Sequence, residues 1–200
     1  VTGKYLHEIG EVDEIWVSPM LRACQTAEPI TKSTGAKVRV MPDLHEIHGA
    51  FSRDESGNIS VLPGRTCREI EEAHDGFRVQ TVYMADPDNA GPDTGYYEGR
   101  GFETESGCIR RAEAVASRLA EHAAQARGTC VVVVAHGIFF SKLVTAIIGG
   151  HMKAAKHLNC AITRFDMSET GDVMLSYLNN VNHLEPYPEL LPRKMGGGLV

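Results

Sequence analysis

The run Val131–Val134 constrains the fold of this 200-residue chain more than any other feature. Four consecutive β-branched apolar residues leave no polar face, which is typical of a strand buried on both faces of a parallel sheet. We therefore predict a central strand at residues 130–135. His136 and Gly137 follow at once, and residues 138–148 have the apolar pattern of a helix that ends at Gly149.

Strand and helix patterns alternate on both sides of this run. The apolar and turn residues predict strands and helices in this order: a helix at 5–10, a strand at 15–18, a helix at 20–34, a strand at 38–41, a helix at 103–126, and a strand pair at 161–167 and 173–178. Ser18 and Pro19 are interpreted as the N-cap and first residue of the second helix. The alternation favours an α/β fold with parallel strands.

The region between the second strand and the long helix has a different composition. Residues 42–102 are rich in Gly, Pro, Asp and Asn, and they show one short helical stretch at about 66–74. So long a weakly patterned segment inside a compact domain is usually functional or inserted. We interpret it as an excursion that covers a site.

Composition excludes several classes of function. The net charge of −6 and the sequence pI of about 5.8 argue against binding nucleic acid through phosphate contacts. No apolar run reaches the roughly 18 residues that cross a bilayer, so we predict no membrane partner. The five cysteines form no CxxC pair, which predicts reduced thiols. We expect a cytoplasmic protein, or an organellar one if a targeting segment was removed.

Two strand-to-helix junctions carry candidate site residues. Arg22 falls in the first turn of a helix, where its charge opposes the helix dipole, so it suits a phosphate ligand better than helix stability. His136 ends a buried strand, where a histidine must be hydrogen-bonded or used. Gly137 would permit a ligand to approach closely. A surface arginine and a satisfied structural histidine remain the alternatives.

A third candidate is Glu46, which follows the strand at 38–41 in the segment Leu44–Gly49. A carboxylate there is able to act as a general acid or base. The alternative is a metal site made by His45, Glu46 and His48, since imidazole and carboxylate are common ligands. Three neighbouring residues rarely converge on one ion, so we predict no metal.

The order of these motifs resembles the histidine phosphatase superfamily, which includes phosphoglycerate mutases. The matching segments are Ser18–Ala27 (SPMLRACQTA), Leu44–Glu46, Val132–Gly137, Asn159–Thr163 and Asn179–Leu184. Residues 63–66 and 96–105 resemble the long insertion of some eukaryotic members. The resemblance implies a three-layer α/β/α sandwich with a mostly parallel central sheet. It covers a domain at 1–185 with an insertion at about 47–102, followed by a loose tail at 186–200.

The resemblance also implies roles in phosphoryl transfer through a phosphohistidine. Arg22 would bind the phosphate oxygens, His136 would stabilise the transferring group with the Gly137 N–H nearby, and Glu46 would protonate the leaving oxygen. Cationic side chains would neutralise the charge, so no cofactor or metal is implied. A small phosphorylated substrate is the expected partner.

The chain departs from the family at one essential point, because it contains no Arg-His-Gly motif. In the family this motif carries the attacking histidine on a strand that precedes the first helix. A missing central strand would leave two unpaired sheet edges, so we expect an incomplete chain. Four hypotheses follow: a phosphomonoester hydrolase with its nucleophile upstream of this chain, an inactive phosphatase-like binding or structural subunit, a phosphoglycerate mutase, and a metal-dependent hydrolase.

Overall fold

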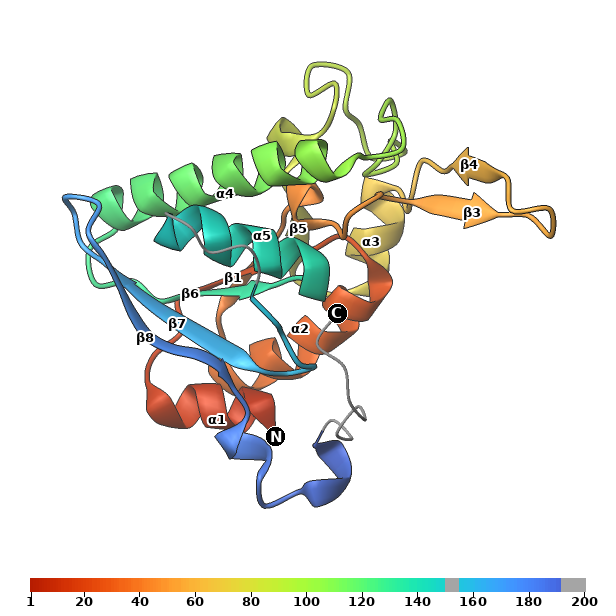
Figure 1. Cartoon of the computed structure of the whole chain (residues 1–200). Coiled ribbons are helices and arrows are strands. Elements are labelled where there is room, and N and C mark those ends of the chain that lie inside the picture. Colours follow the sequence, from red (N-terminus) through yellow and green to blue (C-terminus); the bar gives the residue numbers. More distant parts are fainter. Residues whose placement is uncertain (150–154, 192–200) are drawn as a thin grey trace.

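The computed structural model describes residues 1–149 and 155–191 of the chain. Within them, a central sheet of four parallel strands has the order β5-β2-β1-β6, with bounds β1 Glu14–Val17, β2 Lys37–Val40, β5 Phe77–Val79 and β6 Val131–Val134 (Figure 1). Val17 pairs with Val40 on one side and with Val134 on the other. The carboxyl ends of these three strands therefore meet at one edge of the sheet.

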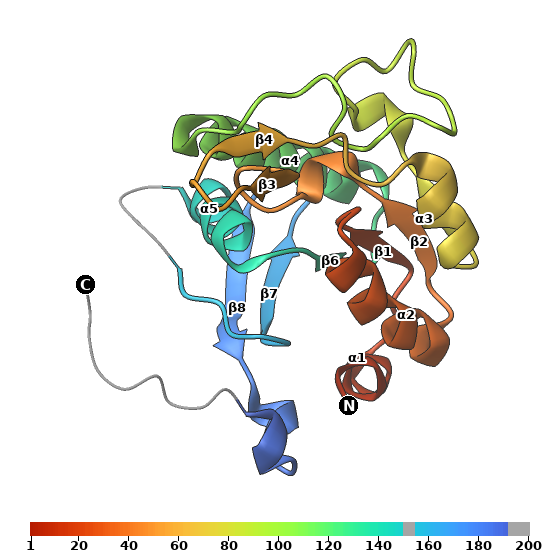
Figure 2. The same ribbon diagram turned by 90° about the vertical axis from the view of Figure 1, so that its right-hand side faces the viewer.

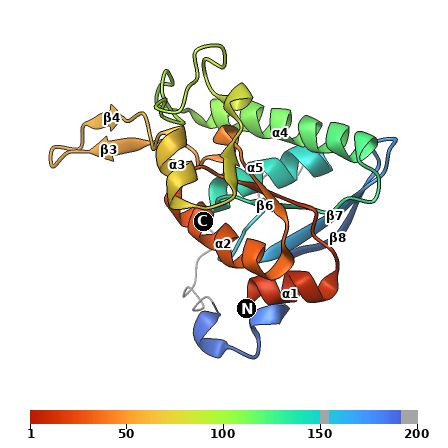
Figure 3. The same cartoon turned by 180° about the vertical axis from the view of Figure 1, so that it is seen from behind.

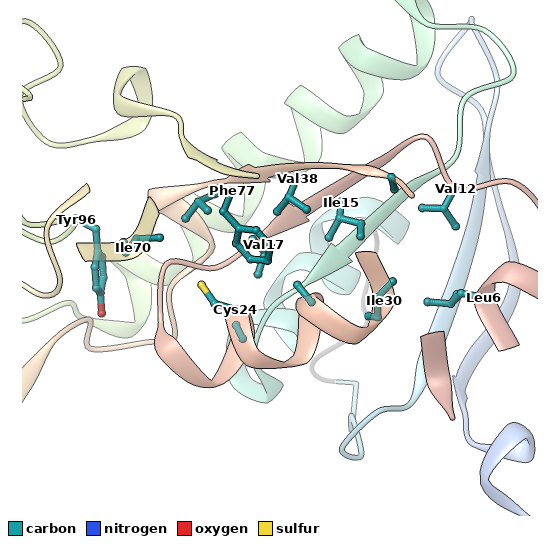
Figure 4. Packing of buried hydrophobic residues seen from close by; sticks show 14 of the residues in the cluster. Leu6, Val12, Ile15, Val17, Cys24, Ile30, Val38, Ile70, Phe77 and Tyr96 are labelled. Carbon is teal, nitrogen blue, oxygen red and sulfur yellow. The ribbon is translucent and has the colours of Figure 1, made fainter. Parts of the chain in front are cut away.

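Helices cover both faces of this sheet. One face carries α1 Thr2–Ile9 and α2 Leu21–Thr34, and the other carries α4 Glu105–Gln125 and α5 Gly137–Ile148 (Figures 1 and 2). Because side chains alternate along a strand, Ile15 and Val17 pack in one cluster with Cys24 and Ile30 of α2 (Figure 4), whereas Trp16 packs against α4 and α5. The predicted three-layer sandwich with a mostly parallel sheet is confirmed.

The segment between β2 and α4 is more structured than the sequence predicts. The expected short helix is present as α3 Cys67–Ala73, and a reciprocal capping box between Thr66 and Glu69 begins it. The segment also contains a hairpin of β3 Phe51–Arg53 and β4 Ile59–Val61, which projects from the body beside α3 (Figure 3).

The same segment also contributes a strand to the central sheet, and the sequence did not predict this strand. Phe77 of β5 pairs with Val38, and Val79 pairs with Val40, so β5 forms an edge of the central sheet. Phe77 is only 1% exposed. The segment at 47–102 is therefore more than a cover, because it supplies one of the four parallel strands.

The C-terminal strands form a hairpin of their own. The predicted pair is present as β7 Ile162–Met167 and β8 Val173–Asn180, which pair antiparallel as a separate two-stranded sheet. Figure 2 shows this hairpin standing beside β6. Beyond it, His183 stacks on Tyr5 at 4.9 Å between ring centroids, which ties the end of the domain to α1.

A cavity of about 1050 Å³ separates β6 from β7; we call it the β6–β7 cleft. Its walls include β6, β7 and apolar side chains of the flanking helices: Leu6, Ile30, Leu119 and Leu143. The valines of β6 are only half-buried, although the sequence predicts a fully buried central strand. The reason is that β6 is an edge of the four-stranded sheet, and no strand in the described residues occupies the cleft.

Two sequence-based expectations concern the whole domain. In the described part of the chain, no helix is both long and apolar enough to cross a membrane. All five cysteines lie in this part and have free thiols, as predicted. Of the expected tail at 186–200, the structure describes a short 3₁₀ helix at Pro188–Leu190, and residues 192–200 lie outside the described residues.

Candidate active site

The junction after β1 differs from the predicted helix start. Helix α2 begins at Leu21 with Met20 in the N-cap position, so the expected N-cap role of Ser18 is wrong. Ser18 is fully buried, and its Oγ accepts a hydrogen bond from the Met20 N–H at 3.3 Å. The Ser18 hydroxyl thus faces inward. Arg22 still falls in the first turn of α2, as predicted, and its side chain is solvent-exposed.

His136 joins the two junctions. Its Nδ1 accepts a hydrogen bond from Arg22 Nε at 3.1 Å, and its Nε2 lies 2.7 Å from Ser18 Oγ. Because a guanidinium only donates, Nδ1 must be the unprotonated nitrogen, and the proton of the neutral ring lies on Nε2 and is donated to Ser18. Burial and, next, the Arg22 charge lower the pKa of His136 to about 4. The ring is therefore neutral near pH 7.

Gly137 begins α5, directly after His136 in the N-cap position. Gly137 is exposed, and apart from its chain neighbours and the backbone of its own helix, no atom of the described residues lies within 4 Å of a Cβ built on it. The first turn of α5 therefore has free space beside Gly137.

Glu46 reaches the same helix start from the loop after the 3₁₀ helix Pro42–Leu44. Its Oε1 accepts from the backbone N–H of Ile47 at 2.9 Å and of Phe139 at 2.8 Å, and its Oε2 accepts from the Ile138 N–H at 3.2 Å. The carboxylate thus lies at the positive end of the α5 dipole, where a negative charge is stabilised.

The neighbouring histidines do not join Glu46 in a metal site. His45 is fully buried, donates from Nδ1 to the Glu46 carbonyl at 2.8 Å, and packs its ring edge against Tyr97. His48 donates from Nδ1 to the Glu103 carbonyl at 3.0 Å and stacks on Phe102. No group of three His, Cys, Asp or Glu side chains suited to a metal gathers within residues 1–149 and 155–191. The metal-site alternative therefore has no support.

The four predicted residues share one site. Arg22, Glu46, His136 and Gly137 all line the β6–β7 cleft, at the edge where β1 and β6 end. A guanidinium, an imidazole and a helix N-terminus together suit an anion with several oxygens, such as a phosphate. The adjacent carboxylate supplies a group that is able to carry a proton.

Comparison with known proteins identifies the family. The model of the histidine phosphatase superfamily, branch 1, matches residues 2–180. The chain belongs to the histidine phosphatase superfamily. A probable phosphoglycerate mutase, GpmB, of Escherichia fergusonii is 28% identical to this superfamily member over 185 residues, which cover 89% of this chain and 75% of that protein.

Solved structures share the fold of this superfamily member. Bacillus stearothermophilus YhfR superposes with a TM-score of 0.57 at 20% identity, covering 92% of this chain and 81% of that one. The ecdysone phosphate phosphatase of Bombix mori, in complex with tungstate, superposes with a TM-score of 0.55 at 18% identity. That match covers 86% of this chain and 66% of the phosphatase.

Two residues that contact the site residues or the loop before them were not predicted from the sequence. Ser18 matched a local N-cap pattern, although its partner His136 lies 118 residues away. Arg111 of α4 is 8% exposed and donates to the backbone carbonyls of Asp43 and His45. An arginine in line with the buried Cys108 and Val115 on one helix face was the signal that could have revealed it.

Proposed function

We propose that this chain is the larger part of a phosphomonoester hydrolase that transfers a phosphoryl group through a phosphohistidine. The observation that carries the proposal is the junction of Arg22 with His136, beside the open N-terminus of α5 and the carboxylate of Glu46. This set supplies positive charge for the phosphoryl oxygens and a proton carrier for the leaving group, which are the main needs of phosphoryl transfer.

Each residue has a distinct role in the proposed reaction. Arg22 turns from His136 to the phosphoryl oxygens, His136 takes up a proton on the freed Nδ1 and donates it to one of these oxygens, and the Gly137 N–H donates to another. A histidine nitrogen attacks phosphorus, the bond from phosphorus to the ester oxygen breaks, and Glu46 delivers a proton to that oxygen. Water then attacks the phosphohistidine, loses a proton to Glu46, and releases phosphate together with the free histidine.

The attacking histidine requires a place from which to act, and we assign it to the β6–β7 cleft. The sequence has no Arg-His-Gly segment, so its 200 residues do not contain the family's nucleophile motif. A strand that paired with β6 in the cleft, parallel to it, would end beside His136 and Arg22. The exposed edge of β6 and the apolar walls of the cleft support this placement.

Orthovanadate, a phosphate-like anion, tests the site in the chain as it stands. We expect it to bind, and we expect Arg22→Ala and His136→Ala each to weaken binding at least tenfold, while Arg39→Ala, a surface variant paired with Glu14, leaves it unchanged. Calorimetry measures the affinities. Equal binding by all four proteins would contradict the assignment of the phosphate site.

The nucleophile is tested separately, by intact mass and N-terminal sequencing of the protein from its source. A preceding strand that contains Arg-His-Gly would support hydrolysis. A natural chain that starts at Val1 would support the second candidate, a catalytically inactive phosphatase-like binding or structural subunit. The absence of the motif from the 200 residues favours that candidate, and the joint presence of Arg22, Glu46 and His136 opposes it.

Mutase activity is the remaining alternative, since one relative is named a probable phosphoglycerate mutase. The segment after Glu46 differs from what we expect of a glycolytic mutase, so we favour release of phosphate from a small ester. Phosphorus NMR of a reaction with 3-phosphoglycerate separates the two. Inorganic phosphate indicates hydrolysis, whereas the 2-phospho isomer indicates a mutase.

A further inference from the structure

We infer that Arg111 of α4 is a positioning residue that fixes Glu46 at the start of α5. The inference rests on the proposed function, in which Glu46 is the proton donor. None of the hydrogen bonds of Arg111 reaches Arg22, His136 or Gly137, so its contacts would act on the reaction through Glu46. Three sets of contacts carry the inference.

The first set holds the backbone that leads into Glu46. Arg111 Nη1 donates to the carbonyl oxygens of Asp43 at 2.8 Å and of His45 at 2.9 Å. These carbonyls flank the last turn before Glu46, so one guanidinium fixes the path of the loop from α4. Buried hydrogen bonds from a charged donor are stronger than neutral ones, and this side chain is almost completely buried.

The second set fixes the guanidinium itself. Arg111 Nε and Nη2 donate to the two carboxylate oxygens of Glu103 at 2.8 and 2.6 Å. Nη2 also points to Cys108 Sγ at 3.7 Å. With the two backbone carbonyls, all five N–H donors of the guanidinium have partners. A lysine has three donors on one nitrogen and is unable to reproduce this arrangement.

The third set connects Arg111 to the other side of Glu46. The guanidinium carbon lies 4.3 Å from the centroid of the Phe139 ring, and the Phe139 N–H donates to Glu46 Oε1 at 2.8 Å. Arg111 therefore contacts both the backbone before Glu46 and the residue that binds its carboxylate. The ion pair with Glu103 alone does not require these contacts on both sides of Glu46.

The same helix provides a matched control in Arg118. This arginine also pairs with an acid of the loop, Asp43 Oδ2 at 2.7 Å, and lies over an aromatic ring, Tyr83 at 3.6 Å. It makes no contact with Glu46 or with the first turn of α5. Replacing either arginine by lysine thus alters a contact with Asp43 and a contact with an aromatic ring, but only Arg111 also binds the His45 carbonyl and packs on Phe139, on the path to Glu46.

The first experiment follows the backbone amides of Ile138 and Phe139, which donate to Glu46, by NMR. We expect Arg111→Lys to shift both amide signals and to speed their hydrogen exchange at least tenfold, and Arg118→Lys to leave both unchanged. Glu103→Gln, a milder change at the same guanidinium, should act like Arg111→Lys with smaller effect. Unchanged amides in folded Arg111→Lys, or equal changes in Arg118→Lys, would overturn the inference.

The second experiment uses the rates of an activated aryl phosphate and an alkyl phosphate. If Arg111 positions the proton donor, Arg111→Lys should slow the alkyl ester about tenfold more than the aryl ester, because only the alkyl leaving group needs the proton. Equal slowing of both esters would count against it. These rates are measured on the natural protein that includes the proposed upstream histidine. If that protein hydrolyses neither ester, the proposed function fails, and the amide signals still decide the positioning role.

Discussion

At the scale of single residues, His136 is held at both ring nitrogens, and its surroundings determine where its proton lies. Ser18 receives the Nε2 proton, and Arg22 donates to Nδ1. A phosphate that attracts Arg22 would free Nδ1, which must then take up a proton before it donates to a phosphate oxygen, while the Nε2–H stays on Ser18 and keeps the ring in place. The buried serine therefore prepares the histidine for one orientation.

Loss of the Ser18 hydroxyl should destabilise the fold. We expect Ser18→Ala to lower the free energy of unfolding by about 1–3 kcal/mol, because it leaves the Nε2–H of His136 buried without an acceptor. Ser117→Ala is the control, since Ser117 is exposed on α4 and bonds only to the Glu113 carbonyl. Urea denaturation compares the two. A loss in Ser18→Ala no larger than in Ser117→Ala would refute the expectation.

Removal of the Arg22 charge should raise the pKa of His136. Burial is the larger cause of its low value of about 4, and the Arg22 charge is the next. In Arg22→Gln we expect the pKa to rise but to stay below the ordinary value of about 6.5, because the ring remains buried. NMR titration of the ring protons measures it. Arg39→Gln should have no effect, and a fall in the pKa of Arg22→Gln would disprove this account.

The residue types of the site were predictable, whereas their mutual contacts were only partly so. Arg22 and His136 lie at the two strand-to-helix junctions that follow β1 and β6, and the parallel sheet explains why these junctions meet. Ser18 was misassigned because a serine followed by proline matches a helix start locally. A hydrogen bond to a residue 118 positions away leaves no mark in the local pattern.

At the scale of secondary structure, helix α5 takes its N-terminal cap from a distant loop. The Glu46 carboxylate binds the N–H groups of Ile138 and Phe139, as an N-cap side chain normally does from the adjacent residue. Phosphoryl transfer would need this carboxylate to be protonated in turn. The helix start and the proposed proton donor therefore depend on each other.

Glu46→Ala should loosen the first turn of α5. We expect it to cost about 0.5–2 kcal/mol of stability, as for loss of a helix cap, and to speed hydrogen exchange at Ile138 and Phe139. Glu105→Ala is the control. Glu105 is an exposed residue of α4, and it forms an ion pair with Lys142 of α5. This variant should leave those two amides unchanged. Equal exchange in both variants would show that Glu46 does not cap α5.

Strand β5 was not predicted from the sequence for a physical reason. β5 has three residues, one of them the polar Arg78, so it is too short to show a period. It becomes a strand because the edge of β2 offers partners, and the Phe77 side chain is buried in the core. The strong pattern of β6 was recognised, but its neighbours depend on the whole sheet and not on its own residues.

At the scale of the whole molecule, two hydrophobic cores lie on opposite faces of the central sheet, and the β6–β7 cleft lies along the edge that β6 forms. The sequence predicted the three layers because the alternation of strands and helices admits few arrangements. The missing central strand stays a prediction, and the valines of β6 are half-buried. The lining of the cleft depends on residues from seven helices and strands and from the loops between them, which no local pattern encodes.

The folded molecule should lose stability as the pH falls below neutrality, because it buries two neutral histidines. Burial lowers the pKa of His45 to about 3 and of His136 to about 4, whereas both titrate near 6.5 in the unfolded chain. Between these values the unfolded state binds more protons than the folded state. Stability is therefore fully present above about pH 6.5 and decreases as the pH falls toward 4.

Urea denaturation between pH 7.5 and 5 measures this dependence above the range in which carboxylates titrate. We expect unfolding to take up close to one proton for each of the two histidines at the low end of that range. His45→Gln removes one of them, so its stability should depend less steeply on pH, whereas His7→Gln, a change at an exposed residue of α1, should keep the wild-type slope. Stability that stays constant or rises toward pH 5 would mean that the two rings are protonated in the folded state. In that case the hydrogen bond from Arg22 to His136 Nδ1 could not form.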